Sequence, residues 1–445
     1  MSVKGMIVLL MLVACSLSLS AQGIDTRTVD QETYRAWQDG QWKSLIGTGR
    51  KAMKAGIDFY YLRVRMGVAW YRLGNYHMAV RYLEKARKMN PEDNETNELL
   101  YYALLFSGLD DEAAILAKEF PAELKKKTGA DHKPKVSSLR LVFNTAFPSG
   151  QDEPDNYIPP SDTQMNGIQY TGKERYIAAL HLTHRLSPRS VLTHGYTYTN
   201  QNHFVFGRND STEKTIADYR TVLHQYYLNL SLRVARRWEM NGGIHYTMIR
   251  FPFIWQNTPV GRGRNAPSSH GVDHNLSGWM SVYRYFPYVH AGTTIYYSEL
   301  NQTHPLQADV HINVFPLGNK NLYLLNDVSA LWLFEENESE NLWGWRVTAG
   351  GRLARWCWAE GGAGFGNRRN FLSDGGMVVH NSTDRILQSF DANLLFFPSS
   401  RIRLSISYSY SLMRSDFVPV QYYDNTYNKI IYSLHSISGG LKWNF

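Results

Sequence analysis

The fold of this chain is decided by one stretch near its end, Arg401-Ile402-Arg403-Leu404-Ser405-Ile406-Ser407-Tyr408-Ser409-Tyr410-Ser411-Leu412. Every even-numbered position carries Ile, Leu or Tyr, and every odd-numbered position carries Arg or Ser. A period of two residues places the apolar side chains on one face of a β-strand. The stretch is longer than a soluble strand of about 5–6 residues. It suits a tilted membrane strand of about 9–11 residues with a short extension.

The same alternation continues through residues 137–445, which we expect to form an antiparallel transmembrane β-barrel. Tight turns such as Ser187-Pro188 and Phe286-Pro287 alternate with longer polar connections such as 148–172, 201–217 and 367–383. Short turns at one end and long loops at the other are typical of outer-membrane barrels. About 14 strands are predicted, with 12 to 16 left open. They begin near Ser138, Tyr176, Arg189, Thr221, Arg237, His274, Val289, Gln302, Asn321, Asn341, Arg355, Asp384, Arg401 and Lys429.

Aromatic residues support a membrane location for these strands. They make up 13% of the chain and gather near segment ends, as at Trp238 and in the pair Trp356 and Trp358. Barrels place such residues at both membrane interfaces. The last strand ends in a further signature, which resembles the C-terminal signal that the barrel-assembly machinery recognises. It consists of Leu441, Trp443 and Phe445.

The N-terminus reads as a secretory signal peptide over residues 1–21. Lys4 supplies the positive charge, Met6 to Ala14 form a short apolar region, and small residues up to Ala21 offer a cleavage site. Leu12-Val13-Ala14-Cys15 also resembles a lipobox, which leaves open that Cys15 is lipidated. If Cys15 leaves with the signal, Cys357 has no partner for an intramolecular disulfide.

Residues 26–127 show a helical repeat. Gly40, Gly74 and Gly108 are 34 residues apart, which is the tetratricopeptide period. The middle repeat carries the signature most fully, at Gly67, Trp70, Gly74, Tyr76, Ala79, Ala86 and Pro91. Such repeats stack into a solenoid with a concave surface, which binds a protein partner or serves only as a spacer. A basic linker, residues 128–136, follows.

The expected fold class is therefore α + β and multidomain, with a short all-α solenoid before the barrel. This layout resembles outer-membrane proteins that join periplasmic tetratricopeptide repeats to a barrel. One such family is the YaiO-like group, and another is the exopolysaccharide export porins for poly-N-acetylglucosamine and cellulose. The resemblance implies an outer-membrane location with the N-terminal domain in the periplasm. The export porins carry many more repeats than this chain.

Catalytic motifs are missing from the sequence. It contains no P-loop, G-x-S-x-G, H-E-x-x-H or C-x-x-C, so we predict no enzyme, metal or cofactor. Histidines such as His181, His245 and His311 fall in predicted strands, and a lumenal His–Ser or His–Asp pair keeps a barrel-embedded hydrolase as a minor alternative. The net charge of +8 is spread along the chain, which argues against nucleic-acid binding.

Arginines cluster near the tight turns and are predicted to form a basic ring at the periplasmic mouth. They would guide anionic solutes or anchor the barrel to headgroups. The ring consists of Arg185, Arg189, Arg233, Arg237, Arg401 and Arg403. An acidic group, Glu335, Glu336, Glu338 and Glu340, is expected outside, in contact with solvent or lipopolysaccharide.

The sequence favours a channel or export pore whose repeats recruit a periplasmic partner. The alternative is a non-conducting structural or interaction protein anchored in the outer membrane. The other expected contacts are outer-membrane lipid, lipopolysaccharide and the barrel-assembly machinery.

Overall fold

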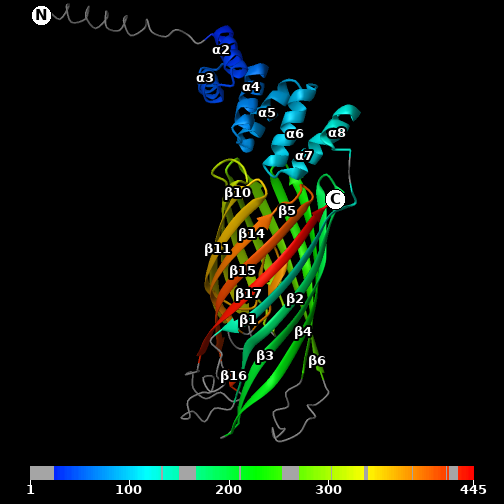
Figure 1. Cartoon of the computed structure of the whole chain (residues 1–445), viewed down its shortest axis with the longest axis vertical. Coiled ribbons are helices and arrows are strands. Elements are labelled where there is room, and N and C mark those ends of the chain that lie inside the picture. Colours follow the sequence, from blue (N-terminus) through cyan, green and yellow to red (C-terminus); the bar gives the residue numbers. More distant parts are fainter. Residues whose placement is uncertain are drawn as a thin grey trace, which may run out of the picture. The chain divides into compact units, whose positions relative to one another are not determined.

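A computed structural model describes residues 25–131, 134–149, 167–209, 212–252, 270–301, 303–334, 339–382, 384–416, 418–419 and 429–445 (Figure 1). The predicted signal peptide, Cys15 and three glutamates of the acidic group (Glu335, Glu336 and Glu338) lie outside these residues. The chain divides after Leu109 into two compact units. Among the described residues, no helix combines the length and the apolar character needed to cross a membrane.

The described residues of the first unit, 25–109, contain five α-helices. They are α2 (Thr26–Gln38), α3 (Trp42–Lys54), α4 (Tyr60–Arg72), α5 (Tyr76–Met89) and α6 (Asn94–Phe106). Gly40 and Gly74 follow α2 and α4 with positive φ angles of 67° and 78°. A left-handed residue ends a helix readily when it is glycine, because glycine has no Cβ to clash. The glycines at the repeat interval therefore sit at helix ends.

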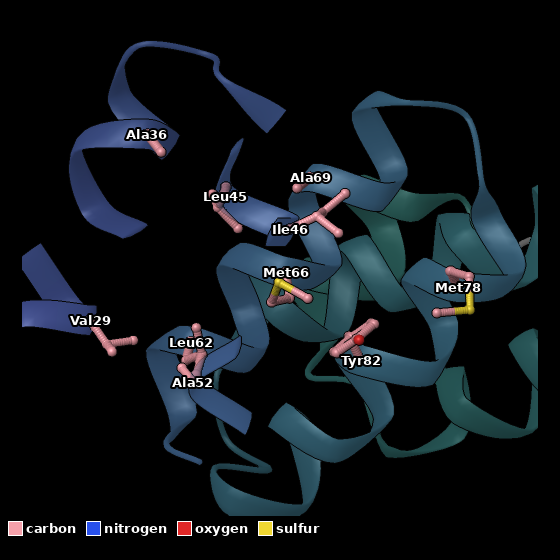
Figure 2. Close-up of a cluster of buried hydrophobic side chains, with 10 residues drawn as sticks. All are labelled: Val29, Ala36, Leu45, Ile46, Ala52, Leu62, Met66, Ala69, Met78 and Tyr82. Atoms are coloured by element: carbon pink, nitrogen blue, oxygen red, sulfur yellow. The ribbon is translucent and has the colours of Figure 1, made fainter. Parts of the chain in front are cut away.

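An interior cluster of apolar side chains in this unit includes Leu45, Leu62 and Met66 (Figure 2). All three are fully buried. Small residues let the helices approach closely, since a Cβ at Gly67 would lie 2.5 Å from Leu83 Cγ. The predicted signature residues Ala79 and Ala86 are likewise fully buried. This unit has the ordinary arrangement of a water-soluble domain, with apolar atoms inside.

The second unit begins with α7 (Asp110–Leu116), the 3-10 helix η1 (Ala117–Glu119) and α8 (Ala122–Thr128). Its main feature is an antiparallel barrel of fourteen strands. The barrel is closed, because β1 pairs with both β17 and β2. The barrel strands are β1 (Val136–Ser149), β2 (Gly167–Ser187), β3 (Ser190–Asn209), β4 (Thr212–Ala235), β5 (Trp238–Pro252), β6 (His270–Tyr285), β7 (Val289–Ser298), β8 (Leu306–Val314), β9 (Leu322–Phe334), β10 (Ser339–Ala354), β11 (Cys357–Arg368), β14 (Arg385–Phe396), β15 (Ile402–Asp416) and β17 (Lys429–Asn444). The predicted fold class and the fourteen strands are confirmed.

The predicted tight turns lie at one end of the barrel, where β1 starts and β17 finishes. One predicted loop is wrong. Residues 201–217 were expected to be an irregular connection, but β3 and β4 continue until Asn209 pairs with Thr212. Ladder hydrogen bonds join backbone groups, so strands in a hairpin extend through polar sequence once the apolar alternation has stopped.

The two faces of the barrel wall differ in polarity. Phe143, Ile295 and Ile406 point outward and are 56–63% exposed. Inward positions on the same strands carry polar side chains, including Asn144, Thr294 and Ser405. This arrangement reverses that of a soluble domain, and it predicts that the outer surface contacts lipid.

In the described part of the chain, three short strands lie outside the fourteen. β12 (Phe371–Ser373) and β13 (Val378–His380) form a hairpin in the connection between β11 and β14. β16 (Val418–Pro419) adds to the edge of β2.

Candidate functional site in the barrel lumen

The β12–β13 hairpin is bound to inward-facing side chains of distant strands. Gln307 on β8 makes two hydrogen bonds to the backbone of Leu372: its Nε2 donates to the carbonyl at 2.9 Å, and its Oε1 accepts from the N–H at 3.0 Å. On β5, His245 Nδ1 lies 2.8 Å from the carbonyl oxygen of Gly376. Inward side chains of two well-separated strands thus hold the hairpin within the lumen.

Apolar packing supports these hydrogen bonds. Trp279, Tyr296 and Leu300 form a buried cluster with Leu372. Gly376, in the hairpin turn, has a φ of 80°, and a Cβ there would lie 2.5 Å from Trp279 Cε3. Leu331, Leu333 and Leu342 form a second buried cluster with Phe371. The hairpin therefore carries its own small core inside an otherwise polar lumen.

The ends of the same connection are held by polar contacts. Asn301 Nδ2 donates to Asn370 Oδ1 at 2.8 Å. Glu340, the described member of the predicted acidic group, forms ion pairs with Arg369, at 3.1 Å, and with Arg385. This glutamate was expected on a solvated loop, but it lies at the start of β10 and fixes the connection to the barrel.

Three of the predicted mouth arginines have acidic or acceptor partners within the second unit. Arg233 is 5% exposed and pairs with Glu239 at 3.0 Å and with Asp111 at 3.4 Å. Arg185 pairs with the same Asp111 at 2.8 Å. Arg237 occupies a tight turn at a φ of 61°, and its backbone N–H donates to Glu112 at 2.6 Å. Helix α7 therefore supplies carboxylates that offset part of the predicted basic ring.

The other three predicted mouth arginines differ from these. Arg189 and Arg401 are exposed at turns, and Arg403 lies half-buried on the inward face of β15. Among the described residues none of the three forms an ion pair with a carboxylate. Arg403 lies opposite Lys442 of β17, which sequence reasoning did not place in the site.

The terminal signature residues Leu441 and Trp443 lie in β17, the strand that closes the barrel, and Phe445 directly follows it. β17 pairs with β15 on one side and with β1 on the other. Trp443 and Phe445 are 43% and 50% exposed, and the Phe445 N–H donates to the Ser137 carbonyl at 3.1 Å.

Three lumenal side chains, a hydroxyl, an imidazole and a carboxylate, form a hydrogen-bonded chain like that of a nucleophilic enzyme. Thr294 Oγ1 lies 2.9 Å from His311 Nε2, and His311 Nδ1 lies 2.5 Å from Asp327 Oδ1. A hydroxyl, an imidazole and a carboxylate in that order are the elements of a catalytic triad. The Thr294 side chain is fully buried, however, so its hydroxyl does not meet a substrate in this arrangement. In the described residues, no group of His, Cys, Asp and Glu is placed to hold a metal.

No family model and no curated protein matches the chain. Several solved structures are similar to part of the chain. The Pseudomonas putida toluene transporter TodX has a TM-score of 0.44 at 7% identity, with 70% of this chain and 91% of that chain covered. A Pseudomonas aeruginosa FadL homologue has a TM-score of 0.42 at 10% identity, covering 70% and 90%. A bacterial polysaccharide outer membrane secretin has a TM-score of 0.36 at 10% identity, with 70% of this chain and 99% of that chain covered. Similarities this low do not assign a function to the chain.

The lumenal hairpin is the main feature that sequence reasoning missed. Residues 367–383 are predicted from the sequence as a polar external loop. They nevertheless contain two short apolar runs, Phe371-Leu372 and Met377-Val378-Val379, on either side of a Gly-Gly turn. Apolar residues inside a long loop indicate that the loop packs on another part of the protein, so the sequence did carry a signal for the hairpin.

Proposed function

We propose that the second unit is an outer-membrane β-barrel that serves as a channel, and that the β12–β13 hairpin constricts its lumen. The observation that carries this proposal is the inverted polarity of the barrel wall together with the hairpin held by Gln307 and His245. Side chains alone fill the interior of an eight-stranded barrel, whereas fourteen strands enclose a wider lumen. The hairpin supplies the additional filling.

Location is tested first. The mature protein should fractionate with the outer membrane and migrate faster in unheated gel samples than in boiled ones. Recovery of the folded chain as a soluble periplasmic protein would exclude the membrane barrel.

Conduction is tested with the full chain in planar bilayers. We expect a small conductance that rises when residues 370–382 are replaced by a short Gly-Ser linker. Gln307→Ala removes both hydrogen bonds to Leu372, so it should increase opening without removing any part of the hairpin. Asn313→Ala, also inward on β8, is the matched control and should behave like the parent. Barrels that stay closed in every variant would favour the non-conducting anchor instead.

For the helical unit we retain the tetratricopeptide identity and the role of a periplasmic adaptor as a proposal. Its support is an exposed aromatic group around one arginine. The guanidinium of Arg65 lies 5.2 Å from the ring centroid of Tyr34 and 5.8 Å from that of Tyr61, whose exposed fractions are 44% and 62%. Tyrosine side chains are common anchors in protein interfaces, and Arg65, which pairs with Asp30 at 2.7 Å, holds these two rings in place. Deleting residues 26–109 should abolish partner crosslinking and leave the single-channel conductance unchanged.

The mouth arginines remain candidates for guiding anions. A ring of fixed charge in a narrow opening concentrates counter-ions. Since Arg233 is paired with carboxylates and Arg401 is not, Arg401→Gln together with Arg403→Gln should shift selectivity toward cations more than Arg233→Gln does. Reversal potentials across a salt gradient measure this shift. Unchanged selectivity with reduced barrel stability would make the arginines interfacial anchors.

A further inference from the structure

Three cationic side chains lie next to one another on the lumenal face of adjacent strands. Arg140 of β1 is directly opposite Lys442 of β17, and Lys442 is directly opposite Arg403 of β15. Residues directly opposite on antiparallel strands have Cβ atoms only about 4.5–5.5 Å apart. Their strand neighbours Trp443 and Leu404 are exposed on the outer face, so the three cations face inward. We call this set the lumenal basic row.

The basic row is not neutralised by a direct ion pair. Among the described residues, no carboxylate lies within ion-pair distance of its three members. Glu360 and Asp110 attract Arg403 and Lys442 only through space, and Lys320 adds repulsion. Arg140 Nη1 contacts Met377 Sδ, at 3.6 Å. Three like charges side by side are unfavourable unless an anion lies between them.

The wall beside the basic row is built from short side chains. Val142, Gly440 and Ser405 occupy the next inward positions on the same three strands and lie opposite one another. A Cβ at Gly440 would lie 2.4 Å from Ser405 Oγ, so the absence of a side chain lets this hydroxyl lie over β17. A hydroxyl donor is thus placed next to the cations, and no bulky side chain from these three positions covers them.

An additional unsatisfied group lies at the end of the row. His181 of β2 is directly opposite Arg140 and is 6% exposed. Its ring lies over Gly195 of β3, and neither ring nitrogen has a hydrogen-bond partner in the described part of the chain. Buried polar atoms are usually hydrogen-bonded, so such a group calls for an explanation. An anion held by Arg140 would supply negative charge beside this imidazole.

We propose that Arg140, Lys442 and Arg403, with the Ser405 hydroxyl, form a lumenal binding site for an oxyanion, a phosphate or carboxylate group of a solute inside the barrel. Guanidinium and ammonium groups form short charge-assisted hydrogen bonds to such oxygens, and arginine binds them in a bidentate manner. The geometry of the site is independent of conduction, but its role in transport rests on the proposed channel.

The test is calorimetric titration of the full chain in detergent, with inorganic phosphate in one arm and acetate in the other. Saturable binding of either anion is expected. Lys442→Gln and Arg403→Gln should each weaken it about tenfold, which corresponds to about 1.4 kcal/mol. Arg352→Gln makes the same charge change on β10, three strands away from β15, and should leave the affinity as it is. Unheated gel mobility establishes that each variant is folded, and Arg140→Gln replaces any variant that is not.

Absence of binding to the parent chain, or equal affinity in all variants, would overturn the proposal. A barrel that conducts in bilayers but binds neither anion would support the proposed channel and contradict the proposed binding site. A barrel that binds phosphate, with weaker binding in the Lys442 and Arg403 variants, but stays closed would support the binding site and contradict the channel. Binding of only one anion identifies the oxygen-bearing group.

Discussion

The helical unit and the barrel place their apolar side chains on opposite sides of their folds. In the first unit Leu62 is fully buried and its neighbour Tyr61 is 62% exposed. In the barrel Ile406 is 58% exposed, while the polar residue Gln307 is 2% exposed. Average hydropathy does not distinguish these arrangements, because both contain a mixture of apolar and polar residues. The period of the pattern and the direction in which it faces do distinguish them.

The largest expected effect is in the helical core. Leu62→Ala should destabilise the first unit by about 2–5 kcal/mol, because it removes buried apolar surface and leaves a cavity. Tyr61→Ala, one position earlier on α4, should cost far less. Chemical denaturation followed by circular dichroism measures both. Equal losses would show that the burial contrast along α4 is not what stabilises this unit.

The same contrast should reverse in the barrel. Ile406→Arg places a charge on the proposed lipid face and should cost about 2–4 kcal/mol near the bilayer midplane. Ser407→Arg, the next residue on β15, points into the lumen and should cost much less. Urea unfolding in lipid vesicles, read by gel mobility, compares the two. If Ser407→Arg proved the more damaging, the assigned faces of β15 would be wrong.

A smaller effect is expected at the hairpin turn. Gly376→Ala should cost about 1–3 kcal/mol of local strain, because φ is positive and the new Cβ meets the Trp279 ring. Gly375 also has a positive φ, but a Cβ at this position would have no atom within 4 Å. Gly375→Ala therefore isolates the backbone cost from the packing cost. Protease accessibility of the hairpin should rise more for Gly376→Ala than for Gly375→Ala.

The smallest effect concerns the start of α6. The Asp93 side chain accepts from the Thr96 N–H at 3.0 Å and from the Tyr60 hydroxyl at 2.6 Å. Burial raises the pKa of Asp93, but hydrogen bonds from Thr96 and Tyr60 outweigh burial and hold this pKa below its ordinary value. Asp93→Ala should cost about 1 kcal/mol as a lost helix cap.

The sign of the pH effect follows from the lowered pKa of Asp93. The unfolded carboxyl binds a proton more readily than the folded one. Its contribution to stability is therefore fully present above the ordinary pKa, about 3.9. It is lost as the pH falls through the lower folded value. Asp93→Asn should therefore reduce the loss of stability at acid pH in denaturation curves of the first unit. If that loss is unchanged, other carboxyl groups cause it.

Much of the fold was predictable, because it depends on local periodicity. The strict alternation in 401–412 predicted a membrane strand, and the fourteen segment starts predicted the strands that the structure shows. The loop 201–217 was predicted wrongly, because backbone pairing continues where side-chain alternation stops. The role of the mouth arginines stays a prediction, and Asp111 of α7, which pairs with Arg185 and Arg233, lies far away in sequence and was not foreseen.

Sequence alone determined the strand period, most of the turn positions and which side chains of a strand share a face, because these depend on the alternation along the strand. Tertiary structure alone decided what meets inside the lumen. The Gln307 contact with Leu372 and the row of Arg140, Lys442 and Arg403 join residues distant in sequence. The register of β17 against β1 and β15 sets that row, and a slip of one residue would turn its side chains toward lipid.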